Sequence, residues 1–303
     1  MVAPLVPADL QAELRAWAPG GRAVPVESTI GGYSNLTFVA RIGDDDCVVK
    51  AAATPAKRAD LRREADMLRR LADAEVPFAC PEALVLLDGN WTVLVMRRVE
   101  GTSALTGRVT PAGLRVRAGL VGELLASVHA TVLSPLGDPS ADLDLGRRAH
   151  AVAAALTAAE LPPVIAEPLA AALGDPLLQR GISPVHGDFG LHNVLWRTVG
   201  RRPPAVALLF DWEWSGWGNP LIDTAWLWWT FQHRRIAPDA WNAFVDGYGR
   251  AALQAMGWSA STVNTMIRAQ MAQILVRTTP DSSGREEWLK RLRELDRLAP
   301  PRL

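Results

Sequence analysis

Two acidic side chains and one amide in the second half of the chain could together carry out phosphoryl transfer. Asp188 and Asn193 are separated by four residues, and Asp211 follows an apolar run at residues 207–210. A carboxylate beside an alcohol can orient the hydroxyl and accept its proton. Carboxylate and amide oxygens also suit Mg²⁺, which commonly binds beside nucleotide phosphates. We therefore expect Asp188 to act on an acceptor hydroxyl, and Asn193 and Asp211 to bind the metal.

The Asp188–Asn193 spacing has alternative explanations. Asp and Asn are common in loops, so turn formation alone could account for both residues. His186 and His192 flank Asp188 and could form a metal-hydrolase cluster, but no further His or Cys lies nearby in the sequence to complete a closed site. The same spacing occurs in the catalytic loop of protein kinases, which favours phosphoryl transfer.

A lysine in the first third of the chain could bind nucleotide phosphates. Lys50 lies inside an apolar strand pattern at residues 47–51. A strand-edge lysine whose stem covers apolar neighbours is the alternative explanation. Glu64 lies on the next predicted helix, and its carboxylate could hold the lysine ammonium group in place. We expect Lys50 to reach the α- and β-phosphates with Glu64 as its partner.

A glycine-containing turn precedes the lysine strand. Gly31 and Gly32 have no Cβ atoms, so backbone N–H groups there could approach phosphate oxygens. Ser34 and Asn35 could add side-chain contacts. Most Gly-Gly turns are only hairpin turns, but this one lies where a phosphate-covering loop would be expected. The sequence contains neither a P-loop motif nor a Rossmann fingerprint.

The elements around these residues predict an α+β fold with two lobes. Apolar patterns predict strands at 24–30, 36–42, 47–51, 83–87 and 91–96, with a helix at about 55–73 capped by Thr54. Helical patterns follow at 114–133, 149–172, 240–256, 261–276 and 285–298, around a β-rich island at 182–214. We expect a small antiparallel-sheet lobe with one helix at residues 1–97, and a larger, mainly helical lobe at 98–303.

Composition narrows the class of protein. The 303 residues are 49% apolar and 21% charged, as in soluble globular proteins. The 32 basic and 32 acidic residues balance, which argues against a nucleic-acid partner or attraction to an anionic membrane. Residues 1–20 show no signal-peptide pattern. We expect a cytoplasmic monomer or homodimer in which Cys47 and Cys80 are reduced thiols.

Taken together, the motifs resemble the aminoglycoside phosphotransferase and choline kinase-like family. The resemblance spans roughly residues 28–225, and its combination of motifs is specific although no single motif is. The matching positions are the turn at 31–35, Lys50, Glu64, the segment 95–101, His186-Gly187-Asp188, Asn193, Asp211-Trp212-Glu213, Gly218-Asn219-Pro220 and Asp223. Two positions depart from the family pattern: His192 stands where Gly or Pro is common, and Asn219 where Asp is common.

This resemblance implies a two-lobed, protein-kinase-like fold with ATP or GTP and Mg²⁺ bound between the lobes. The implied roles are adenine contacts at Met96, Arg97 and Val99, Asp188 as catalytic base, Asn193 and Asp211 as metal ligands, and His186 and Asp223 as supports of the catalytic loop. The implied activity is transfer of the γ-phosphate to a hydroxyl group of a small molecule.

The acceptor stays open at this stage. The chain lacks the acidic C-terminal tail of some aminoglycoside kinases, so another antibiotic, a sugar or a nucleoside-like alcohol is also a candidate. Six tryptophans lie between 212 and 229; most suit a buried core, whereas Trp214 and Trp217 are candidates for an acceptor pocket and Glu213 for holding a substrate amine or hydroxyl. An aromatic cage would favour a choline- or ethanolamine-type kinase. A non-catalytic nucleotide-binding module is the alternative from another class, but it would be expected to lack one of the key residues.

Overall fold

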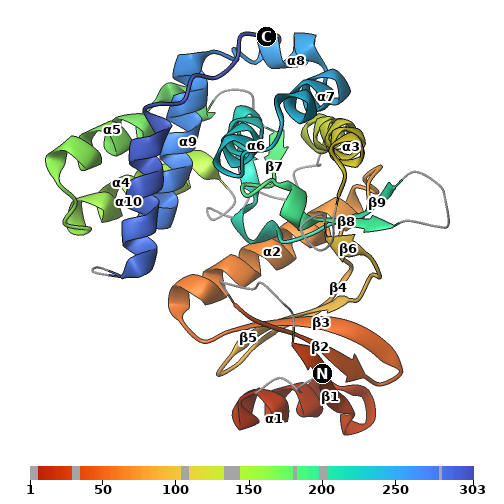
Figure 1. The fold of residues 1–303 in the computed structure, drawn as a ribbon. Coiled ribbons are helices and arrows are strands. Elements are labelled where there is room, and N and C mark those ends of the chain that lie inside the picture. Colours follow the sequence, from red (N-terminus) through yellow and green to blue (C-terminus); the bar gives the residue numbers. More distant parts are fainter. Residues whose placement is uncertain are drawn as a thin grey trace.

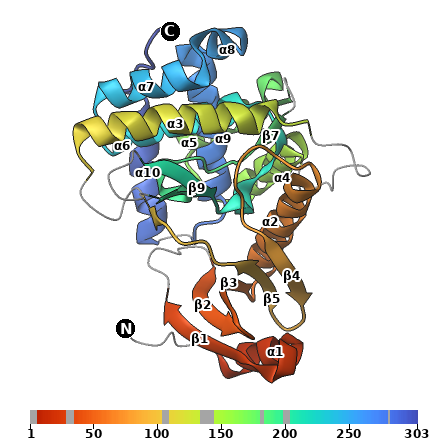
Figure 2. The same cartoon turned by 90° about the vertical axis from the view of Figure 1, so that its right-hand side faces the viewer.

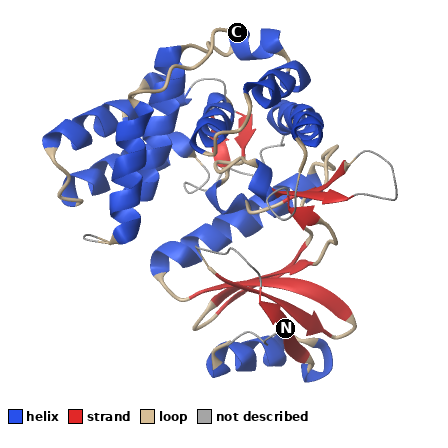
Figure 3. Cartoon of the chain, in the orientation of Figure 1, coloured by secondary structure: helices blue, strands red, loops and turns tan. Residues whose placement is uncertain are grey.

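An antiparallel five-stranded sheet forms the N-terminal lobe (Figures 1 and 3). In the computed structural model, the described residues are 6–28, 35–103, 109–132, 144–179, 183–197, 204–279 and 282–303. The strands pair in the order β1-β2-β3-β5-β4. Their bounds are β1 Ala23–Ser28, β2 Leu36–Ile42, β3 Asp45–Ala52, β4 Ala83–Asp88 and β5 Thr92–Arg97. All five strands were predicted from the sequence to within a few residues.

One helix packs on each face of this sheet. Successive side chains of a strand point to opposite faces, and on β5 Val93 and Val95 belong to the core under α1 (Ala8–Trp17), whereas Leu94 and Met96 join the core under α2 (Pro55–Asp73). Figure 1 shows α1 and α2 on opposite sides of the sheet. The sequence predicted α2 but not α1.

The start of α2 follows the predicted signals only in part. Pro55 occupies the first turn, where its missing N–H costs no hydrogen bond. Thr54 is the N-cap residue with an extended backbone, but its side chain makes no capping hydrogen bond. The position of the helix start is therefore set by the proline more than by the threonine.

The C-terminal lobe is mainly helical, as predicted. Its helices are α3 Pro111–Ala130, α4 Leu145–Ala158, α5 Pro163–Leu173, α6 Leu221–His233, α7 Pro238–Tyr248, α8 Arg250–Ala255, α9 Ala260–Leu275 and α10 Ser283–Leu295. The predicted segment 149–172 is divided at Pro162 and Pro163, and the segment 240–256 is divided at Gly249, whose φ of 102° ends the regular helix. Among the described residues, no helix combines the length and apolar character that crossing a membrane requires.

Short strands and turns in this lobe hold the candidate site residues. Strands β6 (Thr102–Ser103), β8 (Val194–Arg197) and β9 (Ala205–Leu209) form one small sheet, and β7 (Ser183–Val185) pairs with β10 (Gly216–Gly218). The segment 186–193 connects β7 to β8, and Asp211 lies two residues after β9. The predicted β-rich island at 182–214 therefore contains several short strands, β7, β8 and β9, in its described part.

Neither cysteine forms a disulfide. Cys47 is buried in the sheet core, where burial raises the pKa of its thiol. Cys80 is half-buried, and burial raises the pKa of its thiol to about 11. Both groups are therefore protonated at neutral pH when they are thiols.

Helices α3 and α7 pack side by side through glycines (Figure 2). A Cβ added at Gly122 would overlap the Phe244 carbonyl oxygen and lie 2.6 Å from the Tyr248 nitrogen, whereas a Cβ added at Gly119 would lie 3.6 Å from the nearest atom, the Ala243 oxygen. The two helices can approach this closely only because Gly122 has no side chain.

We therefore expect Gly122→Ala to destabilise the protein and Gly119→Ala, on the same helix, to leave it equal or more stable. Overpacking costs about 1–3 kcal/mol, and the helical preference of Ala over Gly returns at most about 1 kcal/mol. Urea unfolding of both variants measures the difference. Equal stability of the two variants would contradict the close packing.

Candidate active site

Lys50 brings the two lobes together through two carboxylates. Its Nζ lies 2.7 and 2.8 Å from the two carboxylate oxygens of Glu64 on α2, and 2.5 Å from Oδ1 of Asp211 after β9. Lys50 and Glu64 are almost fully buried, while 32% of the Asp211 side chain stays exposed. The structure thus joins three residues that the sequence predicted for one nucleotide site.

The charges of this cluster are strongly coupled. Burial alone lowers the pKa of Lys50, but Asp211 and Glu64 outweigh burial and hold it above its usual value. Burial opposes ionisation of Asp211, yet Lys50 keeps the pKa of Asp211 below its ordinary value. Burial raises the pKa of Glu64. One ammonium group between two carboxylates leaves an excess of negative charge, which a divalent cation would offset.

The backbone at Asp211 turns the carboxylate toward the other lobe. Asp211 has φ 70° and ψ 57°, a left-handed conformation that is uncommon outside glycine. The short helix that follows, Trp212–Trp214, begins with the Trp212 N–H donating to Oε1 of Glu64 at 3.2 Å. The Trp212 indole is fully buried below it. Packing and hydrogen bonding therefore stabilise a conformation that costs free energy locally.

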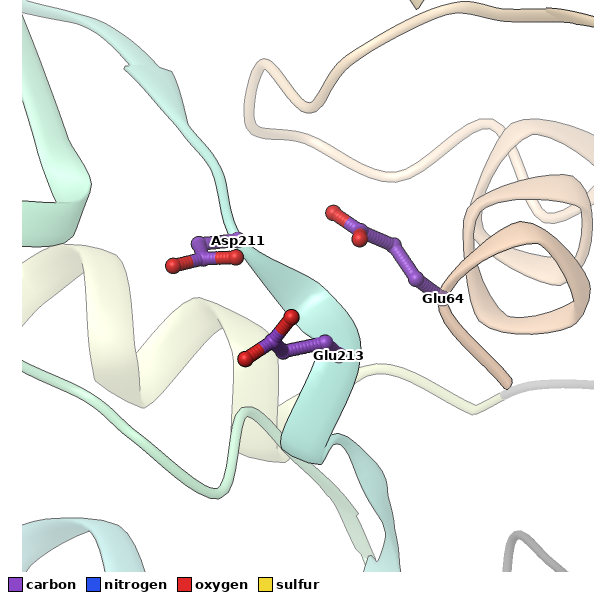
Figure 4. Close-up of side chains that lie close together, drawn as sticks. All are labelled: Glu64, Asp211 and Glu213. Carbon is purple, nitrogen blue, oxygen red and sulfur yellow. The ribbon is translucent and has the colours of Figure 1, made fainter. Parts of the chain in front are cut away.

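Carboxylate oxygens gather beside Asp211. Glu64, Asp211 and Glu213 each place a carboxylate oxygen within 4.8 Å of the other two (Figure 4). Oε2 of Glu213 accepts a hydrogen bond from Nδ2 of Asn35 at 2.6 Å, which joins the start of β2 to the other lobe. Glu213 is buried. These hard oxygen donors fit Mg²⁺, and the partly exposed Asp211 is the one best placed to reach a bound ion.

Asp188 is fixed by an indole and an amide. Nε1 of Trp226 on α6 donates to Asp188 Oδ1 at 2.8 Å. Nδ2 of Asn193 lies 2.9 Å from the Asp188 backbone oxygen and 3.3 Å from Oδ2, so the amide oxygen is the atom that could bind a cation. His192 Nε2 lies 3.5 Å from Oδ2. The sequence placed Trp226 in the core, and no local signal indicated its contact with Asp188.

The start of the 186–193 loop is fixed by a buried carboxylate. Asp223 on α6 accepts the N–H groups of His186 and Gly187, both at 2.7 Å. It also lies 3.1 Å from Nε2 of His129 on α3, whose Nδ1 lies 2.8 Å from the Tyr248 hydroxyl. The sequence predicted supporting roles for Asp223 and His186 but gave no reason to single out His129 or Tyr248.

The His186 ring ties the loop to the strand that carries Asp211. Its Nε2 lies 2.9 Å from the Phe210 carbonyl oxygen, which can only accept, so Nε2 carries the hydrogen. Nδ1 then accepts the Asp188 N–H at 3.4 Å. Burial lowers the pKa of His186, consistent with this neutral form. In addition, the Phe210 N–H donates to the Asn193 oxygen at 3.0 Å, so the two metal-ligand candidates lie on hydrogen-bonded neighbouring segments.

The remaining predicted positions lie around this centre. Met96 is buried at the end of β5, Arg97 is exposed and pairs with Glu82, and Val99 is half-buried. The backbone N–H of Arg97 already donates to the Glu82 oxygen, so an adenine ring would use other backbone groups of the segment 96–99. Gly31, Gly32 and Ser34 lie outside the described residues.

The tryptophans divide largely as expected. Trp212, Trp226, Trp228 and Trp229 are buried in the core, while Trp214 and Trp217 are half-buried. The guanidinium of Arg277 lies 4.1 Å from the centre of the Trp214 ring and covers one face of it. A bound substrate could therefore reach only the remaining surface of Trp214.

Comparison with known proteins gives the class of the chain. The profile of the phosphotransferase enzyme family matches residues 27–260, and the chain belongs to this family. A sequence search found no similar protein among the curated proteins.

Solved structures confirm the two-lobed, protein-kinase-like fold. The chain is similar to aminoglycoside-3'-phosphotransferase of type VIII, with a TM-score of 0.65 and 23% identity over 87% of this chain and 97% of that chain. It is also similar to a thermostable mutant of aminoglycoside phosphotransferase APH(4)-Ia in a ternary complex with ADP and hygromycin B (TM-score 0.62, 17% identity, 91% and 95% covered). A third similar structure is the GDP complex of wild-type aminoglycoside 2'-phosphotransferase-IIIa (TM-score 0.63, 15% identity, 91% and 92% covered).

We expect Asp223→Asn to lower the free energy of unfolding by about 3 kcal/mol, because an amide cannot accept from both backbone N–H groups and leaves a buried donor unpaired. Asp246→Asn is the matched control: this side chain on α7 is 74% exposed and lies 3.7 Å from Arg250. The control should change stability by less than about 0.5 kcal/mol. Denaturant unfolding of both variants checks the expectation, which a neutral Asp223→Asn would contradict.

Proposed function

We propose that this protein is an ATP- or GTP-dependent, Mg²⁺-dependent kinase that phosphorylates a hydroxyl group of a small molecule. The observation that carries the proposal is the 2.5 Å contact between Lys50 and Asp211, because it joins the lobes at one point. The hydrogen bond from Phe210 to Asn193 brings the Asp188 loop beside that point. Membership of the phosphotransferase enzyme family supports the same activity.

Lys50 and the sheet lobe would bind the nucleotide. Glu64 fixes the Lys50 ammonium group, which would contact the phosphates once the nucleotide is present. Asn35 directly precedes β2 and follows the predicted glycine turn in the sequence, so its amide would be a further candidate for a phosphate contact. Two of the similar structures are complexes with ADP or GDP, which supports a purine nucleotide without choosing between adenine and guanine.

Asp211 and Asn193 would hold the metal ion. A bound Mg²⁺ supplies charge neutralisation at the phosphate oxygens. Asp211 offers a partly exposed, ionised carboxylate, and the Asn193 amide presents its oxygen because its nitrogen is bonded to Asp188. Asn193 therefore links the metal site to the catalytic carboxylate.

Asp188 would orient the acceptor hydroxyl and take up its proton. Its side chain is 28% exposed, so an acceptor can reach it. Trp226 and Asn193 fix the orientation of the carboxylate from two sides. A carboxylate that is already held in place loses less conformational entropy when the hydroxyl binds. This lowers the free-energy barrier to phosphoryl transfer.

The acceptor is proposed as an alcohol, with aminoglycosides first among the candidates because the similar structures are aminoglycoside phosphotransferases. Glu213 already accepts from Asn35, and Arg277 covers one face of Trp214. A choline-type cation cage built on that face of Trp214 would have to displace Arg277. The test is a panel of aminoglycosides, sugars, nucleosides and choline with ATP or GTP and Mg²⁺, measured by nucleoside diphosphate release. Nucleotide binding without product from any acceptor would favour the non-catalytic alternative.

With an acceptor found, we expect Asp188→Asn to lower kcat by about 10³-fold, the loss typical for removing a positioned general base. Nucleotide affinity should stay close to that of the wild type, because Asp188 contacts neither Lys50 nor Glu64. Asp246→Asn, which changes an exposed side chain on α7, should turn over like the wild type. Steady-state kinetics and calorimetric nucleotide binding give both quantities, and unchanged turnover in Asp188→Asn would rule out its assignment as the base.

A further inference from the structure

Helix α9 and the turn after it place three polar side chains against the candidate active site. Gln270 and Gln273 are three residues apart on one side of α9, and Arg277 lies four residues further on, in the turn after the helix ends at Leu275. Gln270 and Gln273 are buried. Burying a polar amide costs free energy unless it is hydrogen-bonded, so both side chains need partners. All three lie beyond residue 260, where the match to the family profile ends.

Gln270 makes a hydrogen bond to the 186–193 loop. Its Nε2 donates to the Gly187 carbonyl oxygen at 2.6 Å. Nε2 of Gln273 donates to Oε1 of Gln270 at 3.0 Å, which fixes which end of the Gln270 amide faces the loop. The two glutamines therefore form a chain of two hydrogen bonds that ends at the Gly187 carbonyl oxygen, in the peptide directly before Asp188.

Gly187 is constrained by its backbone conformation, by the nearby Trp214 backbone and by hydrogen bonds at both its N–H and its carbonyl group. Its φ of +81° suits glycine, and a Cβ there would lie 2.7 Å from the Trp214 carbonyl carbon. Its N–H donates to Asp223 on α6, and its carbonyl accepts from Gln270 on α9. Because the Gly187 carbonyl belongs to the peptide that leads into Asp188, losing the Gln270 bond would release that peptide on one side.

Arg277 reaches the other lobe. It donates to Oδ2 of Asp60 on α2 at 3.0 Å and lies against the Trp214 ring. Asp60 also accepts from Arg63 at 2.9 Å, and Arg63 donates to the Glu213 backbone oxygen at 2.6 Å. Asp60 and Arg63 are both buried. Asp60 lies one helical turn before Glu64, the partner of Lys50, and Arg63 directly precedes Glu64.

We propose that Gln270 and Arg277 are positioning residues, through which α9 holds both the 186–193 loop and α2 in the geometry that phosphoryl transfer requires. Gln270 acts on Asp188 through Gly187, and Arg277 acts on Glu64 and Lys50 through Asp60. The proposal rests on the proposed kinase function, and it assigns different kinetic effects to the two residues.

The first arm tests Gln270→Met, which keeps the length of the side chain and removes its amide. Hydrogen–deuterium exchange of peptides covering 186–193 should become faster, by about tenfold if one net hydrogen bond is lost. With an acceptor, kcat should fall about tenfold while the KM for nucleotide stays unchanged. Gln254→Met is the control, since Gln254 makes a similar bond to the Leu303 oxygen on the protein surface.

The second arm tests Arg277→Met. Nucleotide affinity should weaken by about tenfold, because α2 and the Lys50–Glu64 pair lose one support. The 186–193 peptides should exchange as in the wild type. Arg268→Met is the control: Arg268 lies on α9, nine residues before Arg277, and pairs with Asp296 instead of Asp60.

The outcomes separate this proposal from the proposed function. Wild-type exchange of the 186–193 peptides in Gln270→Met, or equal effects of the Gln270 and Arg277 variants on kcat and KM, would overturn the proposal. If the wild type phosphorylates no acceptor, the kinase assignment fails, while exchange and nucleotide binding still decide whether α9 holds the two segments. If Gln270→Met does not fold, Gln273→Met removes the orienting bond alone and should give the same exchange change at smaller size.

Discussion

A buried ammonium group between two carboxylates is the interaction on which the rest of the site depends. Lys50 is carried by the sheet, Glu64 by α2 and Asp211 by the turn after β9, so one ion cluster relates three separately formed elements. Removing one partner from such a buried cluster typically costs several kcal/mol, because the remaining charge is left uncompensated. The positions of the sheet, the helix and the turn must therefore agree at these three residues.

The backbone around this cluster is arranged to keep the charges in place. Asp211 and Gly187 both have positive φ, and each is stabilised by contacts from a different element: Trp212 bonds to Glu64, and Gly187 bonds to Asp223 and Gln270. The buried Asp223 carboxylate satisfies two backbone N–H groups that the turn cannot pair internally. Local strain at the site is thus offset by hydrogen bonds from α2 of the smaller lobe and from α6 and α9 of the larger lobe.

The sequence predicted those parts of the fold whose signals are local. Alternating strands, a proline at the start of α2 and a lysine within a strand each leave a pattern within a few residues, so the sheet lobe and the meeting of Lys50 with Glu64 followed from them. Helix α1 was missed because it buries little more than Leu10 and Leu14 and depends on the sheet beneath it. Contacts such as Trp226 with Asp188 or Gln270 with Gly187 join residues 38 and 83 positions apart, and no short pattern encodes them.

Stability alone does not account for the charges buried where the lobes meet. Asp60, Arg63, Glu64 and Lys50 are all buried there, although apolar side chains of similar volume at such positions are often as stabilising or more so. The same residue types form an exposed pair between Arg62 on α2 and Asp88 at the end of β4, so α2 has no general need for buried ions. What the buried set does provide is direction. Asp60 orients the Arg63 guanidinium, Arg63 reaches the Glu213 backbone oxygen, and Glu64 orients the Lys50 ammonium group. The proposed role, in which a lysine and two carboxylates meet a nucleotide triphosphate, would require that orientation, and an apolar interface of equal stability would not supply it.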